Sequence, residues 1–226
     1  MLMNESSYPR VRSVILAFAA ILLLHSIWLL LAQTSKPSLD ELPTDLRSAD
    51  AAAAENGGAM WAASIGVVRG DLWAVAAFTD AHLLWGESTN PPTQQVIDQA
   101  QRVLDRTIRY APHRASAWLL LAALSVRYRW TRPTPAEALR MSYYTGPNEL
   151  PLVPLRLLLT GAASPAEDLE LQDFVNRDLR LLLARQDKTA ILQAYQRAIP
   201  AWQSFMAQSL RQMDPGFTDS LKLGAQ

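Results

Sequence analysis

Apolar residues recur at helical spacing along most of the chain. Residues 13–32 read SVILAFAAILLLHSIWLLLA, an apolar run without a formal charge. Beyond residue 59, apolar positions return every three to four residues, as on one face of a helix. One such stripe comprises Val96, Ile97, Ala100, Val103, Leu104 and Ile108. We find no segment with the alternation typical of strands, so the pattern predicts an all-α protein.

The apolar run over residues 13–32 predicts a transmembrane helix, because a run of this length makes about 30 Å of helix. A cleaved signal peptide is the alternative, although its apolar core is usually only about 7 to 15 residues long. Arg10 and Arg12 precede the run, whereas Asp40 and Glu41 follow it. The positive-inside rule then places residues 1–12 in the cytoplasm and the rest in the periplasm, as a single-pass protein of a bacterial inner membrane.

Composition divides the remaining chain into three parts. Residues 33–58 contain two prolines, several charges and the pair Gly57-Gly58, which is typical of a linker, and the alanine run within it favours a short helix. Residues 59–214 carry the helical stripes and form the predicted helical domain. Residues 215–226 follow the last stripe and are predicted to be a C-terminal tail.

A repeat pattern emerges around the segment YAPHRASAWLLLAAL, residues 110–124. The spacing of small, apolar and proline residues there matches the end of one helical hairpin and the start of the next: Ala100, Leu104, Pro112, Trp118, Leu121 and Ala122. Small residues let two helices approach closely, a proline ends a helix, and a tryptophan fills the groove between hairpins.

This spacing resembles the tetratricopeptide-repeat superfamily over roughly residues 59–147. The resemblance implies an α-α superhelix of degenerate helical hairpins, whose concave face would receive peptides or partner domains. The later segments GPNEL (residues 146–150) and QAYQRA (residues 193–198) are similar to small membrane-anchored repeat proteins of alphaproteobacteria linked with cell-surface polysaccharide production.

Charge and composition exclude several kinds of chemistry. Lys and Arg together number 21, as do Asp and Glu, so no basic field is present to attract nucleic acid. The chain has no cysteine and only three histidines, which are widely spaced, so we expect no disulfide, thiolate nucleophile or histidine-based metal site. The acidic cluster Glu167, Asp168, Glu170 and Asp173 is interpreted as the first turns of a helix, where carboxylates offset the dipole.

The most distinctive polar segment is RYRWTRP, which contains Arg127, Arg129, Trp130 and Arg132. Arginines interleaved with aromatic residues can stack and can bind carboxylates or phosphates with two hydrogen bonds, so an acidic protein or an anionic glycan is a candidate ligand. The alternative is a structural turn with an aromatic side chain tucked inward.

These features predict a non-catalytic, membrane-anchored scaffold or accessory factor that binds envelope proteins during polysaccharide assembly. The bilayer itself is a partner through residues 13–32, and no catalytic, cofactor or metal-binding residue is assigned. Two alternatives are an assembly factor for another envelope pathway, such as cytochrome maturation, and an envelope enzyme with an unfamiliar site.

Overall fold

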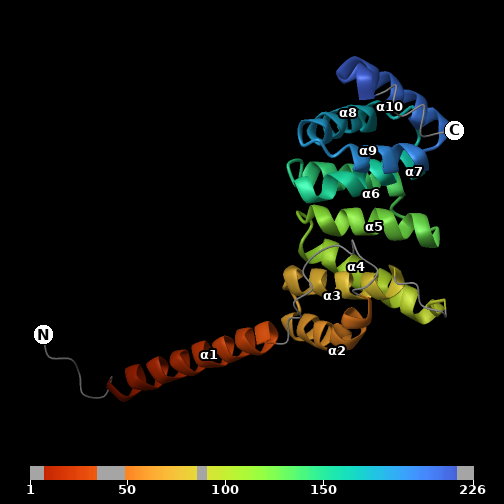
Figure 1. Ribbon diagram of the computed structural model, residues 1–226. Coiled ribbons are helices and arrows are strands. Elements are labelled where there is room, and N and C mark those ends of the chain that lie inside the picture. Colours follow the sequence, from red (N-terminus) through yellow and green to blue (C-terminus); the bar gives the residue numbers. More distant parts are fainter. Residues whose placement is uncertain (1–7, 35–48, 86–90, 218–226) are drawn as a thin grey trace, which may run out of the picture. The chain divides into compact units, whose positions relative to one another are not determined.

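The computed structural model describes residues 8–34, 49–85 and 91–217, and every regular element in these ranges is a helix (Figure 1). The prediction of an all-α protein is therefore confirmed. The helices form two compact units, residues 1–92 and residues 93–226. The helical domain predicted over residues 59–214 thus takes in part of both units.

The first unit begins with α1 (Tyr8–Thr34), the helix expected from the apolar run. Its segment Val11–Thr34 has a mean hydropathy of 2.6, and by length and composition it could cross a membrane. No residue of its most apolar window is buried. The prediction of a long apolar helix near the N-terminus is confirmed.

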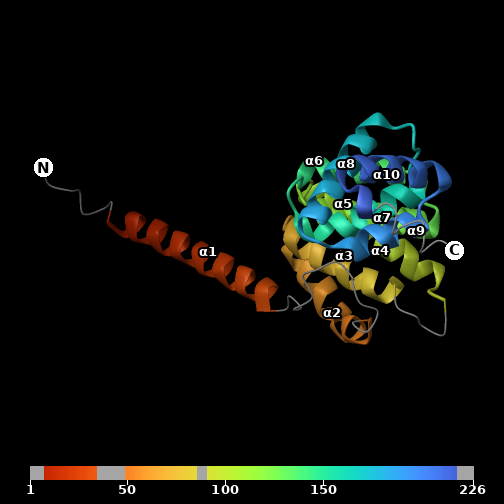
Figure 2. The ribbon, with the colours of Figure 1, turned by 45° about the horizontal axis from the view of Figure 1, so that its top comes forward.

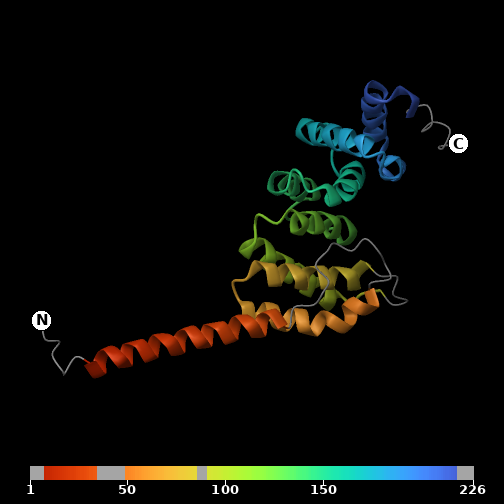
Figure 3. The ribbon, with the colours of Figure 1, turned by 60° about the vertical axis from the view of Figure 1, so that its left-hand side comes forward.

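Two further helices, α2 (Ala49–Gly66) and α3 (Gly70–Trp85), lie side by side in the first unit (Figures 1 and 3). Small side chains line the contact and let the two helices pack closely; Ala59, Ala62, Ala63, Ala74 and Ala77 are all buried. Helix α2 begins inside the range 33–58 that was expected to be a linker, and residues 35–48 of that range lie outside the described residues.

The second unit contains seven α-helices and one 3₁₀ helix within the described residues. They are α4 (Gln94–Tyr110), α5 (Ala115–Tyr128), α6 (Pro135–Thr145), η2 (Leu150–Leu152), α7 (Val153–Ala163), α8 (Leu169–Ala184), α9 (Lys188–Arg197) and α10 (Pro200–Met213). Helices α5 and α6 form a pair, α7 packs against α8 and α9, and α10 packs against the same two helices (Figure 2). Packed helix pairs, as the repeat pattern predicted, are thus present.

Local sequence explains where several of these helices begin. Pro135 and Pro200 occupy first turns, where a missing N–H costs nothing. Thr134 and Glu137 form a capping box at the start of α6, each side chain accepting a hydrogen bond from the other's backbone N–H. Asp168 and Asp187 cap α8 and α9 without a capping box: each carboxylate accepts a hydrogen bond from the backbone N–H three residues later.

The core of the second unit reaches from α5 to α10. Trp202 of α10 is completely buried, and its indole N–H donates to the Ser164 carbonyl at 2.8 Å. Helix α7 approaches the end of α9 closely at Gly161, whose carbonyl accepts from the Ile199 N–H at 2.9 Å. A Cβ atom at Gly161 would lie 2.9 Å from the Cβ of Ala198, so a larger residue would force α7 and α9 apart.

The C-terminal tail was predicted to start at residue 215. Phe217, inside that range, is buried, and the Lys188 ammonium group lies 4.9 Å from its ring centroid. Residues 218–226 lie outside the described residues.

Candidate functional site

The arginines of RYRWTRP come from the end of α5 and the turn that follows it. Arg127 lies in the last turn of α5, and Arg129 is the residue that ends the helix, with a left-handed φ of 55°. Arg127, Arg129 and Arg132 are all exposed. The structure therefore presents three guanidinium-bearing side chains to solvent within one short segment of the second unit.

The two aromatic residues between these arginines stack on each other. The rings of Tyr128 and Trp130 have centroids 6.2 Å apart with planes inclined by 29°, and both side chains are half-buried. The Arg127 guanidinium lies 5.9 Å from the Tyr128 ring centroid, and the Trp130 N–H donates to the Ser125 carbonyl at 3.1 Å. Stacking and this backbone hydrogen bond hold the segment in one conformation, so its arginines could meet an anionic ligand without large rearrangement.

A separate hollow of about 260 Å³ is present elsewhere in the second unit. Its walls come from η2, the start of α7, the end of α8 and the turn before α9. The lining residues are Leu150, Pro151, Val153, Pro154, Leu181, Leu182, Arg185 and Asp187. Most are apolar, and Arg185 and Asp187 add one charge of each sign.

The hollow has the size of a side-chain pocket. Pockets that enclose a drug-sized molecule usually measure about 300 to 1,000 Å³, so this one is slightly smaller and has room for one or two side chains. The turn beneath it is well defined, because the Asp187 N–H donates to the Leu182 carbonyl at 2.9 Å and Asp187 Oδ1 accepts from the Ala190 N–H at 3.1 Å. Such a pocket can receive an anchoring side chain without being rebuilt.

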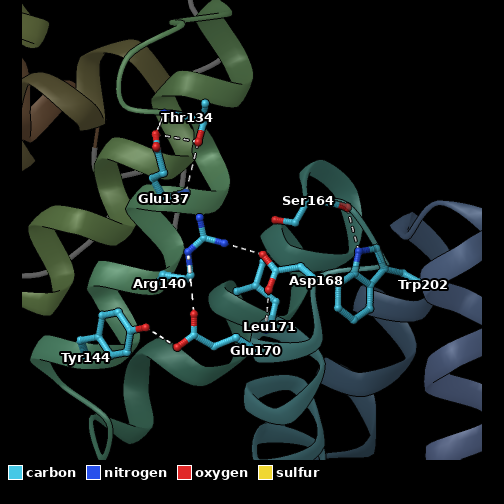
Figure 4. A network of polar contacts seen from close by, with 9 residues as sticks. All are labelled: Thr134, Glu137, Arg140, Tyr144, Ser164, Asp168, Glu170, Leu171 and Trp202. Atoms are coloured by element: carbon cyan, nitrogen blue, oxygen red, sulfur yellow. Dashed lines mark hydrogen bonds and ion pairs between the residues drawn. The ribbon is translucent and has the colours of Figure 1, made fainter.

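Helix α8, which forms one wall of the hollow, is fastened to α6 by a surface network (Figure 4). The Arg140 guanidinium lies between two carboxylates at the start of α8: it donates to Asp168, and its Nε is 4.0 Å from Glu170 Oε2. The Tyr144 hydroxyl donates to Glu170 as well. Of the acidic cluster, Asp168 is the helix cap and Glu170 lies in the first turn, where the dipole interpretation placed them.

A second network joins the same two helices in the interior. The Tyr143 hydroxyl of α6 donates to Asp178 Oδ2 of α8 at 2.9 Å, and both side chains are almost completely inaccessible to solvent. Burial raises the pKa of Asp178 to about 6, although the Tyr143 hydrogen bond and the positive charges of Arg156 and Arg177 oppose the rise. Burial also raises the pKa of Tyr143 well above its ordinary value.

Arg156 of α7 completes this buried network. Its guanidinium donates to Ser142 Oγ at 3.0 Å, to the Ser142 carbonyl at 2.6 Å and to the Gly146 carbonyl at 2.9 Å. These acceptors lie at the C-terminal end of α6, where the helix dipole favours a positive charge. Burial lowers the pKa of Arg156. The three hydrogen bonds hold its guanidinium in place. The cluster thus locks α6, α7 and α8 together.

The repeat positions expected from the sequence fall in α4, α5 and the turn between them. Four of them are buried: Ala100, Leu104, Leu121 and Ala122. Pro112 is exposed in the turn, after α4 has ended at Tyr110. Trp118 is half-buried, and its indole N–H donates to the Pro112 carbonyl at 2.7 Å, so the tryptophan and the proline form one local unit.

Sequence reasoning missed both the hollow and the buried network. A signal existed for each charged member of the network, because Arg156 interrupts the apolar run LVPLRLLL and Asp178 lies between Val175 and Leu179 of a buried stripe. A charge at such a position is rarely left unpaired. Among residues 8–34, 49–85 and 91–217, no three His, Asp or Glu side chains are grouped as a metal ion would need.

Comparison with known proteins returned no relative. No protein-family model matches the chain, and neither a curated protein nor a solved structure matches it. The likeness to tetratricopeptide repeats and to polysaccharide-linked proteins therefore stays a prediction.

Proposed function

We propose that the protein is a membrane-anchored, non-catalytic scaffold whose helical second unit binds another envelope protein during polysaccharide assembly. The observation that carries the proposal is the apolar hollow between η2, α7, α8 and α9, with Arg185 and Asp187 beside it. A partner would insert an apolar side chain into the hollow and place polar groups against the two charges. Binding energy at protein interfaces concentrates in such buried anchors.

The anchor in this proposal is α1. Its apolar segment of 24 residues corresponds to about 36 Å of helix, enough for the hydrocarbon core with some tilt. Arg10 precedes the segment and Arg12 is its second residue, and these two positive charges favour a cytoplasmic N-terminus and a periplasmic second unit in a bacterial inner membrane. A reporter that is active only outside the cytoplasm, fused after Gln226, should then be active, and cytoplasmic-only activity would reverse the orientation.

The buried network favours a binding protein over an enzyme. Asp178, whose pKa of about 6 would suit a general base, is completely buried and accepts a hydrogen bond from Tyr143. It is not among the residues that line the hollow. A catalytic carboxyl group has to reach its substrate, so the position of Asp178 supports a role in packing.

Photo-crosslinking in living cells tests the hollow. A benzoylphenylalanine at Leu150, which lines the hollow, should form an adduct with one envelope protein, and the same residue at the exposed Gln208 of α10 should not. Leu181→Glu, which places a charge in the hollow, should remove the Leu150 adduct. Equal adducts at Leu150 and Gln208, or an adduct that survives Leu181→Glu in a folded protein, would contradict the proposal.

The exposed arginines offer a second contact for an acidic partner segment or an anionic glycan. Replacing Arg127, Arg129 and Arg132 with Gln should weaken partner binding and reduce its dependence on salt. The melting temperature should stay nearly constant, because all three side chains are exposed. A triple variant that binds normally but melts much earlier would assign the segment to structure.

A further inference from the structure

Helix α2 and the turn between α2 and α3 expose three large apolar side chains to solvent. Trp61 of α2 is 47% exposed, and Val67 and Val68 in the turn are 54% and 63% exposed. Val67 has a φ of 40°, in the left-handed region that β-branched residues rarely adopt. The turn therefore exposes two neighbouring valines, and it holds the first of them, Val67, in a conformation that valine does not favour.

This turn is attached to the last two turns of α1. The Trp28 indole N–H donates to the Ile65 carbonyl at 2.9 Å, and Arg69 Nη2 donates to Gln33 Oε1 at 3.2 Å. Ala32, between these two α1 residues, is completely buried. Trp61 lies one helical turn before Ile65, so the exposed indole and the residue bonded to Trp28 share a face of α2.

The position of these contacts along α1 sets the membrane depth at which the exposed apolar side chains lie. Trp28 precedes Ala32, the end of the predicted span, by about 6 Å at 1.5 Å per residue. A group bonded to the Trp28 indole therefore lies at or slightly inside the membrane boundary. Interfacial segments insert their apolar side chains to about this depth, roughly 5 to 10 Å, and tryptophan is enriched in this layer.

We propose that the α2–α3 turn lies in the interfacial layer of the bilayer that α1 spans, with Trp61, Val67 and Val68 in contact with lipid. The inference rests on α1 being the membrane anchor of the proposed function. The Arg69 guanidinium is held by Gln33 and, at 2.6 Å, by Asp71. In the proposed arrangement it lies beside the lipid headgroups, where a charged side-chain end is expected. The first unit is then fixed against the membrane surface.

The absence of cysteine from the chain makes the test direct, because a single introduced cysteine carries the only label. Three full-length variants are compared: Val68→Cys in the turn, Leu16→Cys in the apolar run and Val126→Cys on α5, a valine that is 36% exposed. Each is labelled with a nitrobenzoxadiazole fluorophore and reconstituted into phosphatidylcholine–phosphatidylglycerol vesicles. The vesicles contain lipids with a nitroxide either near the headgroup or deep in the acyl chain.

We expect the shallow nitroxide to quench most of the emission of the label at position 68, and the deep nitroxide to quench much less of it. The label at position 16 should be quenched by nitroxide lipids, and the label at position 126 should keep its emission with both. If position 68 behaves like position 126 while position 16 is quenched, the anchor stands and the interfacial turn is refuted. If position 16 is not quenched, the anchor and the inference that rests on it both fail.

A second copy of the chain is the competing occupant of this apolar surface. In that case the label at position 68 would shift to shorter wavelength without lipid quenching, and energy transfer between donor- and acceptor-labelled copies would appear. This result would also overturn the proposal. Circular dichroism of each labelled variant confirms that the helices are intact.

Discussion

Two neighbouring residues of α6 make the same kind of contact in opposite surroundings. Tyr143 and Tyr144 each donate a hydroxyl hydrogen bond to a carboxylate of α8, to Asp178 and Glu170 respectively. Tyr143 is 1% exposed and Tyr144 is 56% exposed. Arginines accompany both pairs: Arg156 lies in the buried network, and Arg140 in the surface network.

The difference shows that burial, rather than the kind of hydrogen-bond partner, determines how much a polar contact affects stability and pKa. In the interior, lost solvation raises the pKa of Asp178 to about 6, and each missing partner would leave a polar atom without water. At the surface, the hydrogen bond to Glu170 raises the pKa of Tyr144, but water can replace any partner that is lost. The buried network should therefore fix α6 on α8, and the surface network should add little.

The largest effect is expected for Arg156→Met. This change removes the donor to three acceptors at the end of α6 and a positive charge near Asp178. Breaking a buried charged cluster from one side costs about 3 to 5 kcal/mol of unfolding free energy. Urea unfolding measures the loss, and Arg140→Met in the surface network is the control, for which about 0 to 1 kcal/mol is expected. Equal losses would erase the distinction between the networks.

The next effect concerns the pH dependence that Asp178 imposes. Its pKa rises from 3.8 to about 6 on folding, so the folded chain holds the proton more tightly. The stabilisation is complete below about pH 4 and is lost as the pH rises through about 6, a change of about 3 kcal/mol at 1.36 kcal/mol per pKa unit. Tyr143 on α6, Arg156 on α7 and Arg177 on α8 face this carboxyl group.

Asp178→Asn should remove that dependence, because an amide mimics the neutral acid. The unfolding free energy of the variant minus that of the wild type should increase by up to about 3 kcal/mol between pH 4 and pH 7. Thermal unfolding of the variant and of the wild type at several pH values measures this increase. A constant difference for Asp178→Asn across this range would show that the buried carboxyl group does not titrate there.

The sequence could predict what neighbouring residues determine and little of what distant residues determine. The apolar run of α1 is a local pattern, and the structure has a helix there. Pro200 at the start of α10 and the capping box of Thr134 and Glu137, which the structure shows, also depend only on neighbouring residues. The exposed arginines of RYRWTRP are likewise adjacent in the chain, so their shared surface follows from their spacing.

The buried network and the hollow depend on pairings across the chain. Tyr143 and Asp178 are separated by 35 residues, and neither residue marks the other in the sequence. The hollow joins residues 150–154 to residues 181–187. Helical periodicity says which face of a helix is buried but not which helix covers it, so these contacts required the three-dimensional arrangement.

A smaller effect is expected from the tyrosine hydroxyls themselves. Tyr143→Phe removes the donor to Asp178 Oδ2, and the Oδ1 atom has no hydrogen-bond partner among the described residues. The loss should be about 1 to 3 kcal/mol, and the pKa of Asp178 should rise further because the lost hydrogen bond favours the ionised form. Tyr144→Phe, the matched exposed change, should leave the melting temperature unchanged. A comparable loss in both variants would contradict the comparison.

The smallest effect is the coupling between Arg140 and Glu170, measured by a double-mutant cycle with Arg140→Gln and Glu170→Gln. Their charged atoms are 4.0 Å apart, and the Glu170 side chain is 45% exposed, so the coupling should be about 0.2 to 1 kcal/mol. At 1 M salt the screening length falls to about 3 Å, and this coupling should vanish. The coupling between Tyr143 and Asp178, from the cycle with Tyr143→Phe and Asp178→Asn, should persist, because salt does not enter a buried contact. A surface coupling that survives high salt would mean that Arg140 and Glu170 are shielded from solvent and belong with the buried network.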